Sequence, residues 1–178
     1  TAILHSRKMP KGRGVGALTN SGGENSMMAD LAEELGVELP QFSPASAQMV
    51  RAALYDYIAV SNPLDITGPG GSTDLPVLTA SLDAMGSDPN IHIILNNLTG
   101  NVRMDAQSPS GKVFLAMTQK YPEKVWLKAS KMAGNYRDKV TGMPDPIEPV
   151  TNIDGVPFLQ GLDNILKAVK ALIAYAEF

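Results

Sequence analysis

Short apolar runs alternate with stretches in which apolar residues recur every three to four positions. The run at 91–98, IHIILNNL, is continuous rather than alternating, which is typical of a strand covered on both faces of a parallel sheet. Similar runs elsewhere complete the set of expected strands. The pattern predicts strands at 14–19, 37–42, 91–98, 124–129 and 156–159.

Helices are predicted between these strands. Met28, Leu31, Ala32 and Leu35 form the i, i+3, i+4, i+7 stripe of a helix. Further helices are expected after Ser43-Pro44, after a cap at Ser72 or Thr73, over 109–120, weakly over 135–142, and from Leu162 onward. Strands that alternate with helices imply βαβ crossovers. The sequence therefore predicts an α/β fold, a three-layer doubly wound parallel sheet that is flavodoxin-like.

Length and composition predict a single folded domain and argue against several classes of function. The chain has 178 residues, of which 44% are hydrophobic, so one domain with a real core is expected over 1–178, with 1–12 as a lead segment or linker. A net charge of −3 without a basic block argues against nucleic acid. The absence of Cys excludes disulfides, thiolate metal sites and Cys nucleophiles. No apolar run approaches a membrane span, and no signal-peptide pattern is present, so we expect a cytoplasmic domain without membrane contact.

The fold class directs attention to three loops, because ligands in such sheets bind at the carboxyl ends of the strands. The first loop contains Asn20, Ser21, Gly22 and Gly23 and opens a helix. Glycines there would let an anion approach the helix N-terminus, although the same turn also suits a simple tight connection. This loop lacks the residues that a G-x-G-x-x-G or P-loop motif requires.

The other two loops are rich in polar and small residues. The loop 62–72 contains Asp65, Thr67 and Gly68, and either a ligand contact or a plain surface loop fits it. The third loop contains Asn96, Asn97, Thr99 and Gly100. Two Asn side chains at the end of an apolar strand are costly unless their amides find partners, which loop carbonyls or a ligand could supply.

The sequence offers little support for histidine chemistry. His92 lies inside an apolar run, which favours a buried neutral imidazole over a catalytic one, and His5 is expected in solvent. No Ser-His-Asp spacing or cluster of histidines and carboxylates stands out, so neither metal catalysis nor acyl-serine chemistry is indicated. Glu33 and Glu34 are expected on the solvated face of their helix.

Four stretches from about residue 13 to the end carry a family resemblance. They begin GVGALTNSGG, VSNPLDITG, DPNIHIILNNLTG and GVPFLQGLDNIL, in this order. Together they resemble the second flavodoxin-like ligase domain of the NDP-forming acyl-CoA synthetases, relatives of succinyl-CoA synthetase. The pairing of TNSGG with NPLDITG is the most specific part. The segment 143–154 departs from the family pattern.

The resemblance implies part of a larger ligase that converts an acid, CoA and a nucleoside triphosphate to acyl-CoA, NDP and phosphate. In that family, other domains bind CoA, carry a phosphohistidine and hold Mg-NTP in an ATP-grasp fold. Neither His5 nor His92 matches the phosphohistidine, so no catalytic residue, cofactor or metal is expected in this segment, and alone it should be inactive. Its implied role is to offer a helix N-terminus at Asn20–Gly23 to phosphate. The loops at Asp65–Gly68 and Asn96–Gly100 would wall the acyl-phosphate pocket.

Two alternatives from other classes stay open. Regions like acyl-CoA synthetases occur fused to acetyltransferase domains as non-catalytic regulatory modules. A free flavodoxin-like binder of a small molecule is the other alternative, although flavin is disfavoured because no Ser/Thr-rich phosphate loop follows the first strand.

Overall fold

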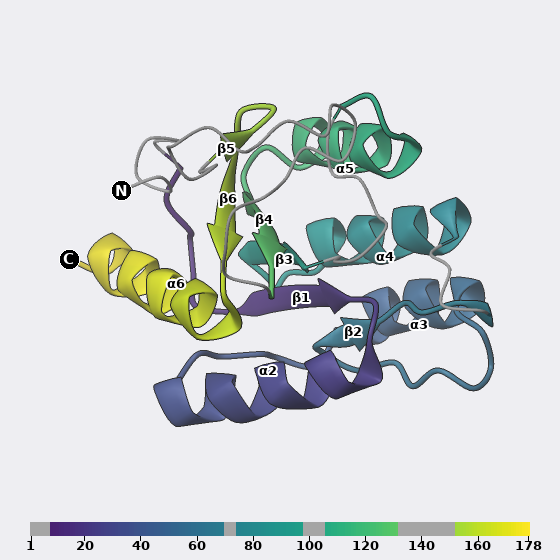
Figure 1. Cartoon of the computed structure of the whole chain (residues 1–178), viewed down its shortest axis with the longest axis horizontal. Coiled ribbons are helices and arrows are strands. Elements are labelled where there is room, and N and C mark those ends of the chain that lie inside the picture. The colour runs from purple at the N-terminus through teal and green to yellow at the C-terminus, as the bar shows by residue number, and fades with distance from the viewer. Residues whose placement is uncertain (1–7, 70–73, 98–105, 132–151) are drawn as a thin grey trace, which may run out of the picture.

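A computed structural model of the chain describes residues 8–69, 74–97, 106–131 and 152–178. Strands and helices alternate along most of this chain, as the apolar pattern predicts (Figure 1). The strands are β1 (Val15–Thr19), β2 (Leu64–Asp65), β3 (Ile93–Asn97), β4 (Val125–Ser130), β5 (Asn152–Ile153) and β6 (Val156–Gln160). The helices are α2 (Gly22–Leu35), α3 (Pro44–Ala53), α4 (Leu75–Ser87), α5 (Pro109–Lys120) and α6 (Leu162–Ala176).

The strands form one sheet in the order β2-β1-β3-β4-β6-β5. Five of them are parallel, and the two-residue strand β5 pairs antiparallel with β6. Counted in chain order, the five parallel strands run 2-1-3-4-5, which is the flavodoxin-like order. This confirms the predicted fold class.

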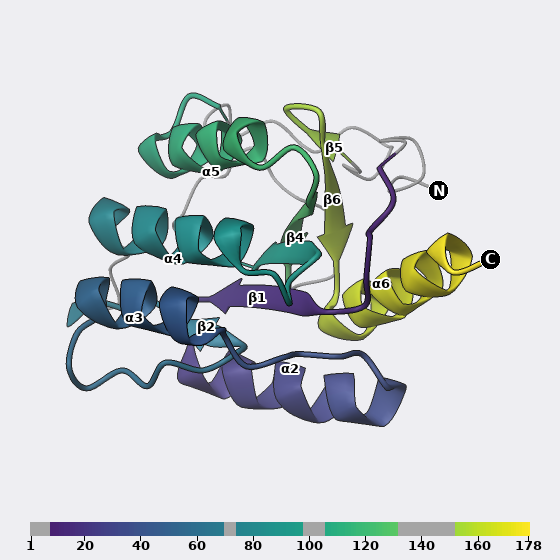
Figure 2. The same cartoon turned by 180° about the vertical axis from the view of Figure 1, so that it is seen from behind.

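Helices cover both faces of the sheet. One face packs against α2 and α6, and the other against α3, α4 and α5, which lie side by side (Figures 1 and 2). Each face has its own apolar core. The first includes Met28, Ala32, Ile165, Leu166 and Val169. The second includes Val50, Leu78, Leu82, Phe114 and Trp126.

Local sequence signals set several helix ends. Gly36 ends α2 with φ 68°, a left-handed conformation that glycine adopts without a side-chain penalty. Ser43 caps α3 by accepting a hydrogen bond from the N–H of Ser46, and Ser108 caps α5 through the N–H of Gly111. In both helices the next residue is proline, which suits the first helical position.

The predicted strand at 37–42 is wrong. This segment lies beside the start of β1, where the N–H of Val15 bonds to the carbonyl of Glu38. A ladder does not continue from there, because Pro40 has no N–H and its carbonyl accepts from the side chain of Asn62. The position beside β1 is taken instead by β2, with Leu64 opposite Leu18 and Asp65 opposite Thr19.

Two further predictions concern the start of α4 and the region from 135 to 154. The N-cap of α4 is Asp74, whereas the predicted caps Ser72 and Thr73 lie outside the described residues. The predicted helix at 135–142 also lies outside them, and the end of the unusual 143–154 segment forms β5 and a turn at Asp154.

Within the described ranges, no helix combines the length and apolar character that a membrane crossing requires.

Candidate functional site

Polar residues meet at the carboxyl edge of the sheet. Thr19 ends β1, Asp65 ends β2 and Asn97 ends β3, and in the parallel register Thr19 is the partner of both others. The helix α2 begins at Gly22, three residues after Thr19. The structure therefore brings the start of α2 to the edge where Asp65 and Asn97 lie. Thr99 and Gly100 lie outside the described residues.

The N-terminus of α2 is open. Ser21 occupies the N-cap position, but its side chain makes no capping hydrogen bond. The first bond of the helix joins the N–H of Asn25 to the carbonyl of Ser21, so the three preceding N–H groups have no partner within the helix. A Cβ added at Gly23 would meet no described atom within 4 Å, and one at Gly22 would meet only Asp65 Oδ2, at 3.5 Å.

Asp65 is oriented by Thr67, two residues further along the chain. Its Oδ1 accepts hydrogen bonds from the N–H of Thr67 at 2.9 Å and from the hydroxyl of Thr67 at 2.5 Å. Its Oδ2 receives no hydrogen bond from any described residue and lies beside Gly22. Gly68 is buried next to this turn. A carboxylate oxygen without a donor thus lies beside the first turn of α2.

A second set of contacts fastens α2 to the loop before β2. The hydroxyl of Thr19 donates to Asn25 Oδ1 at 2.5 Å, and Asn25 Nδ2 donates to the carbonyl of Pro63 at 2.9 Å. Asn62 bonds the backbone of Ala17 and Val15 from the same loop. The first part of the loop 62–72 is therefore structural, and Asp65 begins the part that faces the helix N-terminus.

Sequence reasoning missed Glu24, which lies in the first turn of α2 and is only 4% exposed. Its Oε1 accepts a hydrogen bond from Asn97 Nδ2 at 2.6 Å, and its Oε2 lies 3.2 Å from Lys131 Nζ. The signal that could have found it is its spacing, because Glu24 lies four residues before Met28 in the apolar stripe of the helix.

Asn97 keeps one unsatisfied atom. Its side chain is fully buried, and its Oδ1 has no hydrogen-bond partner among the described residues, while its Nδ2 is used by Glu24. A buried polar atom without a partner costs about 1–3 kcal/mol. The amide therefore presents an acceptor that lacks a donor close to the start of α2.

Asn96 belongs to the opposite face of the sheet, because side chains alternate along a strand. Its neighbour Ile94 is in the core under α4 and α5, whereas Ile93 and Leu95 are in the core under α2 and α6. Asn96 is the register partner of Lys128. The structure thus separates Asn96 from Asn97, although the sequence groups them in one loop.

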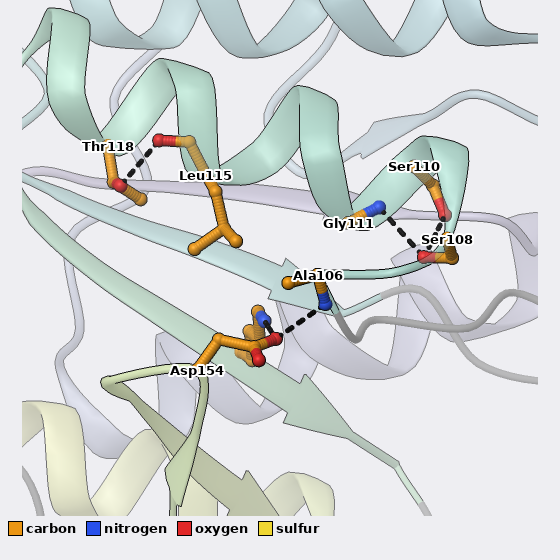
Figure 3. A network of polar contacts seen from close by, with 8 residues as sticks. Ala106, Ser108, Ser110, Gly111, Leu115, Thr118 and Asp154 are labelled. Atoms are coloured by element: carbon orange, nitrogen blue, oxygen red, sulfur yellow. Dashed lines mark hydrogen bonds and ion pairs between the residues drawn. The ribbon is translucent and has the colours of Figure 1, made fainter.

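Lys128 is completely buried on this second face. Its Nζ lies 3.3 Å from Asp154 Oδ2 and 5.5 Å from the centre of the Phe114 ring. Asp154 also accepts a hydrogen bond from the N–H of Ala106 at 2.7 Å, near the start of α5 (Figure 3). Asp154 is therefore a counter-ion for Lys128 and a link between the β5–β6 turn and α5.

His92 lies far from this edge of the sheet. It is partly buried just before β3 begins, where its N–H bonds to the carbonyl of Gly14 and its ring contacts Gly12. Burial, and then the positive charge of Lys124, lower the pKa of His92 below its ordinary value. The sequence predicts a buried ring at His92, whereas the structure leaves the residue partly buried. No group of three or more potential metal ligands occurs in the described parts of the chain.

Curated relatives match about half of the chain. It is 32% identical over 109 residues to the ADP-forming acetate–CoA ligase I of Archaeoglobus fulgidus, and this match covers 59% of the chain and 16% of the relative. It is 30% identical over 94 residues to the alpha subunit of ADP-forming acetate–CoA ligase II of Pyrococcus furiosus, covering 53% and 20%. No family model matches the sequence.

The matched stretches are similar in sequence to ADP-forming acetate–CoA ligases. The chain thus resembles the NDP-forming acyl-CoA synthetases. A third relative, 32% identical over 95 residues, is a trans-feruloyl-CoA synthase from an unknown prokaryotic organism. The matches span only 13% to 20% of the length of these synthetase relatives.

Solved structures share the fold over nearly the whole chain. A protein from Pyrococcus horikoshii OT3 superposes with a TM-score of 0.75 at 20% identity, covering 98% of this chain and 38% of its own. The dinucleotide forming acetyl-coenzyme A synthetase 1 of Ca. Korarchaeum cryptofilum, in its apo form, gives a TM-score of 0.73 at 19% identity, covering 99% and 36%. At these identities the likeness confirms the α/β fold.

Proposed function

We propose that this chain is the second flavodoxin-like ligase domain of an NDP-forming acyl-CoA synthetase, in which α2 offers its N-terminus to the phosphate or acyl-phosphate group. The complete enzyme would convert a small carboxylic acid, CoA and a nucleoside triphosphate to acyl-CoA, NDP and phosphate. The observation that carries the proposal is the uncapped start of α2 at Gly22 and Gly23, in the stretch that resembles the family motif.

The backbone of α2 supplies the chemistry of this site. The N–H groups of Gly22, Gly23 and Glu24 are unused within the helix and can donate to phosphate oxygens. The positive end of the helix dipole adds to this attraction. Lys131 is 42% exposed and lies against Glu24, so its ammonium compensates the buried carboxylate next to the site.

The remaining functions are assigned to other domains. CoA binding, the covalent phosphate carrier and the nucleotide site would lie on partner domains or subunits, consistent with the small fraction of each relative that this chain covers. A structural neighbour carries phosphate and ADP in its complex, which fits a phosphate-handling fold. We place the assembled enzyme in the cytoplasm.

The proposal is tested by comparing the chain alone with the synthetase from which it comes. Purified alone, the chain should form no acyl-CoA from acid, CoA and nucleotide, because the proposed carrier of the covalent phosphate lies on another domain. Together with the domains encoded around it, turnover should appear. Activity of the chain alone would contradict the proposal. A parent protein without a His-bearing domain and an ATP-grasp domain would favour the regulatory module instead.

A further inference from the structure

Among the described residues, backbone donors and side-chain acceptors without hydrogen-bond partners occur together at the start of α2. The donors are the backbone N–H groups of Gly22 and Gly23, which are exposed. The acceptors are Asp65 Oδ2 beside Gly22 and Asn97 Oδ1, whose amide contacts the first turn through Glu24. A ligand that satisfies both kinds of group has to accept hydrogen bonds and also donate them.

Asp65 creates an electrostatic conflict for a fully ionised anion. An anion bound to the N–H of Gly22 would lie close to Asp65 Oδ2, and two like charges at such a distance repel each other strongly away from bulk water. The conflict disappears when the anion carries a proton on the oxygen that faces the carboxylate. The repulsive contact then becomes a charge-assisted hydrogen bond.

We infer, on the basis of the proposed function, that the start of α2 selects a protonated tetrahedral anion, hydrogen phosphate, and discriminates against sulfate through Asp65. The two dianions have the same shape and charge, but sulfate has no hydrogen to donate at neutral pH. Asp65 Oδ2 accepts the phosphate proton, while the backbone N–H groups of the first turn donate to the other oxygens. Asn97 Oδ1 is a further buried acceptor without a partner among the described residues, and it belongs to the amide that holds Glu24 in the first turn.

The orientation of Asp65 makes the selection specific. Both hydrogen bonds from Thr67 go to Oδ1, which fixes Oδ2 toward Gly22. In the variant Asp65→Asn, the same two bonds would hold the amide oxygen in the place of Oδ1. The amide Nδ2 would then take the place of Oδ2, so that a donor replaces the acceptor. Sulfate would gain a hydrogen bond from this exchange.

The test uses inorganic phosphate and sulfate as probes on the ¹⁵N-labelled chain at about pH 8, where phosphate is a dianion with one proton. The amide signals of Gly22 and Gly23 report binding at constant ionic strength. We expect phosphate to bind about ten- to a hundredfold more tightly than sulfate, the size of one hydrogen bond to a charged group. In Asp65→Asn this preference should disappear or reverse.

Asp163→Asn is the matched control, because Asp163 is a carboxylate in the first turn of α6 and pairs with Lys167. It should leave the preference unchanged. Equal affinities of the wild-type chain for the two anions would overturn the inference but leave the phosphate role of α2 standing. An unchanged preference in Asp65→Asn would also overturn it. Absence of any shift at Gly22 and Gly23 with phosphate would overturn both.

Discussion

The carboxylate of Glu24 accepts a hydrogen bond from Asn97 Nδ2 at 2.6 Å, although the two residues are 73 positions apart in the chain. Both side chains are buried, and the bond fixes the first turn of α2 against the end of β3. Lys131, at the end of β4, approaches the same carboxylate. This buried contact sets the direction in which the start of α2 points.

The loss of stability on replacing Glu24 should depend on whether Asn97 Nδ2 keeps a hydrogen-bond acceptor. In Glu24→Ala, Asn97 Nδ2 loses its acceptor, so we expect the free energy of unfolding to fall by about 1–3 kcal/mol. Glu24→Gln keeps an acceptor oxygen and should cost less. Urea unfolding measures both. The exposed Glu33→Ala should change stability by less than about 0.5 kcal/mol, and an equal effect of all three would argue against the buried contact.

The variant Gly22→Asp tests the proposed phosphate site in the complete synthetase. A carboxylate there would repel the anion and block two backbone hydrogen bonds, each worth about 1.5–3 kcal/mol. Turnover should therefore fall by about 10²–10⁴-fold, at about 1.4 kcal/mol per factor of ten. The fold should persist, because the new Cβ would meet only Asp65 Oδ2 among the described atoms, at an ordinary contact distance of 3.5 Å.

Glu33→Gln serves as the control for that experiment, since Glu33 is exposed on the outer face of the same helix. Its turnover should equal that of the wild type, and CoA affinity should be nearly unchanged in both variants. Near-normal turnover of Gly22→Asp would show that α2 does not face phosphate.

Gly14 and Gly23 differ in the space available for a Cβ atom, so alanine substitutions at the two positions test the packing around β1. A Cβ at Gly14 would lie 1.9 Å from the carbonyl oxygen of Asn90, so the backbone before β1 or β3 would have to move. We expect Gly14→Ala to cost about 1–3 kcal/mol or more in thermal or urea unfolding. Gly23→Ala is the matched control, because its Cβ would meet no described atom within 4 Å, and its change should stay within about 0.5 kcal/mol. Similar losses in both variants would contradict this packing.

The pH dependence of stability should report His92. Its pKa is lowered in the folded chain by burial and by Lys124, so the unfolded chain binds the proton more readily. The stability contributed by the neutral ring is present above the ordinary pKa of about 6.5 and declines as the pH falls through the lowered folded value. Urea unfolding between about pH 7 and 5 should show this decline, and His92→Gln should reduce it. An identical decline in the variant would assign it to other groups.

The apolar periodicity alone determined most of the layered fold. The strands β1, β3, β4 and β6 and the helix α5 occur where the pattern of apolar residues predicts them. These signals are local, because burial on two faces requires a continuous apolar run whatever the strand pairs with. The motif TNSGG likewise places the helix start, and with it Gly22 and Gly23, directly after β1.

Only the tertiary structure determined the features that depend on contacts between segments distant in the sequence. β2 is too short, at two residues, to leave a periodic signal, and the segment 37–42 has apolar residues but lacks a partner for a ladder. The order of the strands places β2 beside β1 and thereby brings Asp65 beside Gly22. Glu24 contacts Asn97, at the end of β3, and Lys131, just after β4. Such contacts join residues distant in sequence, and their energy depends on burial, which exists only after the sheet has assembled.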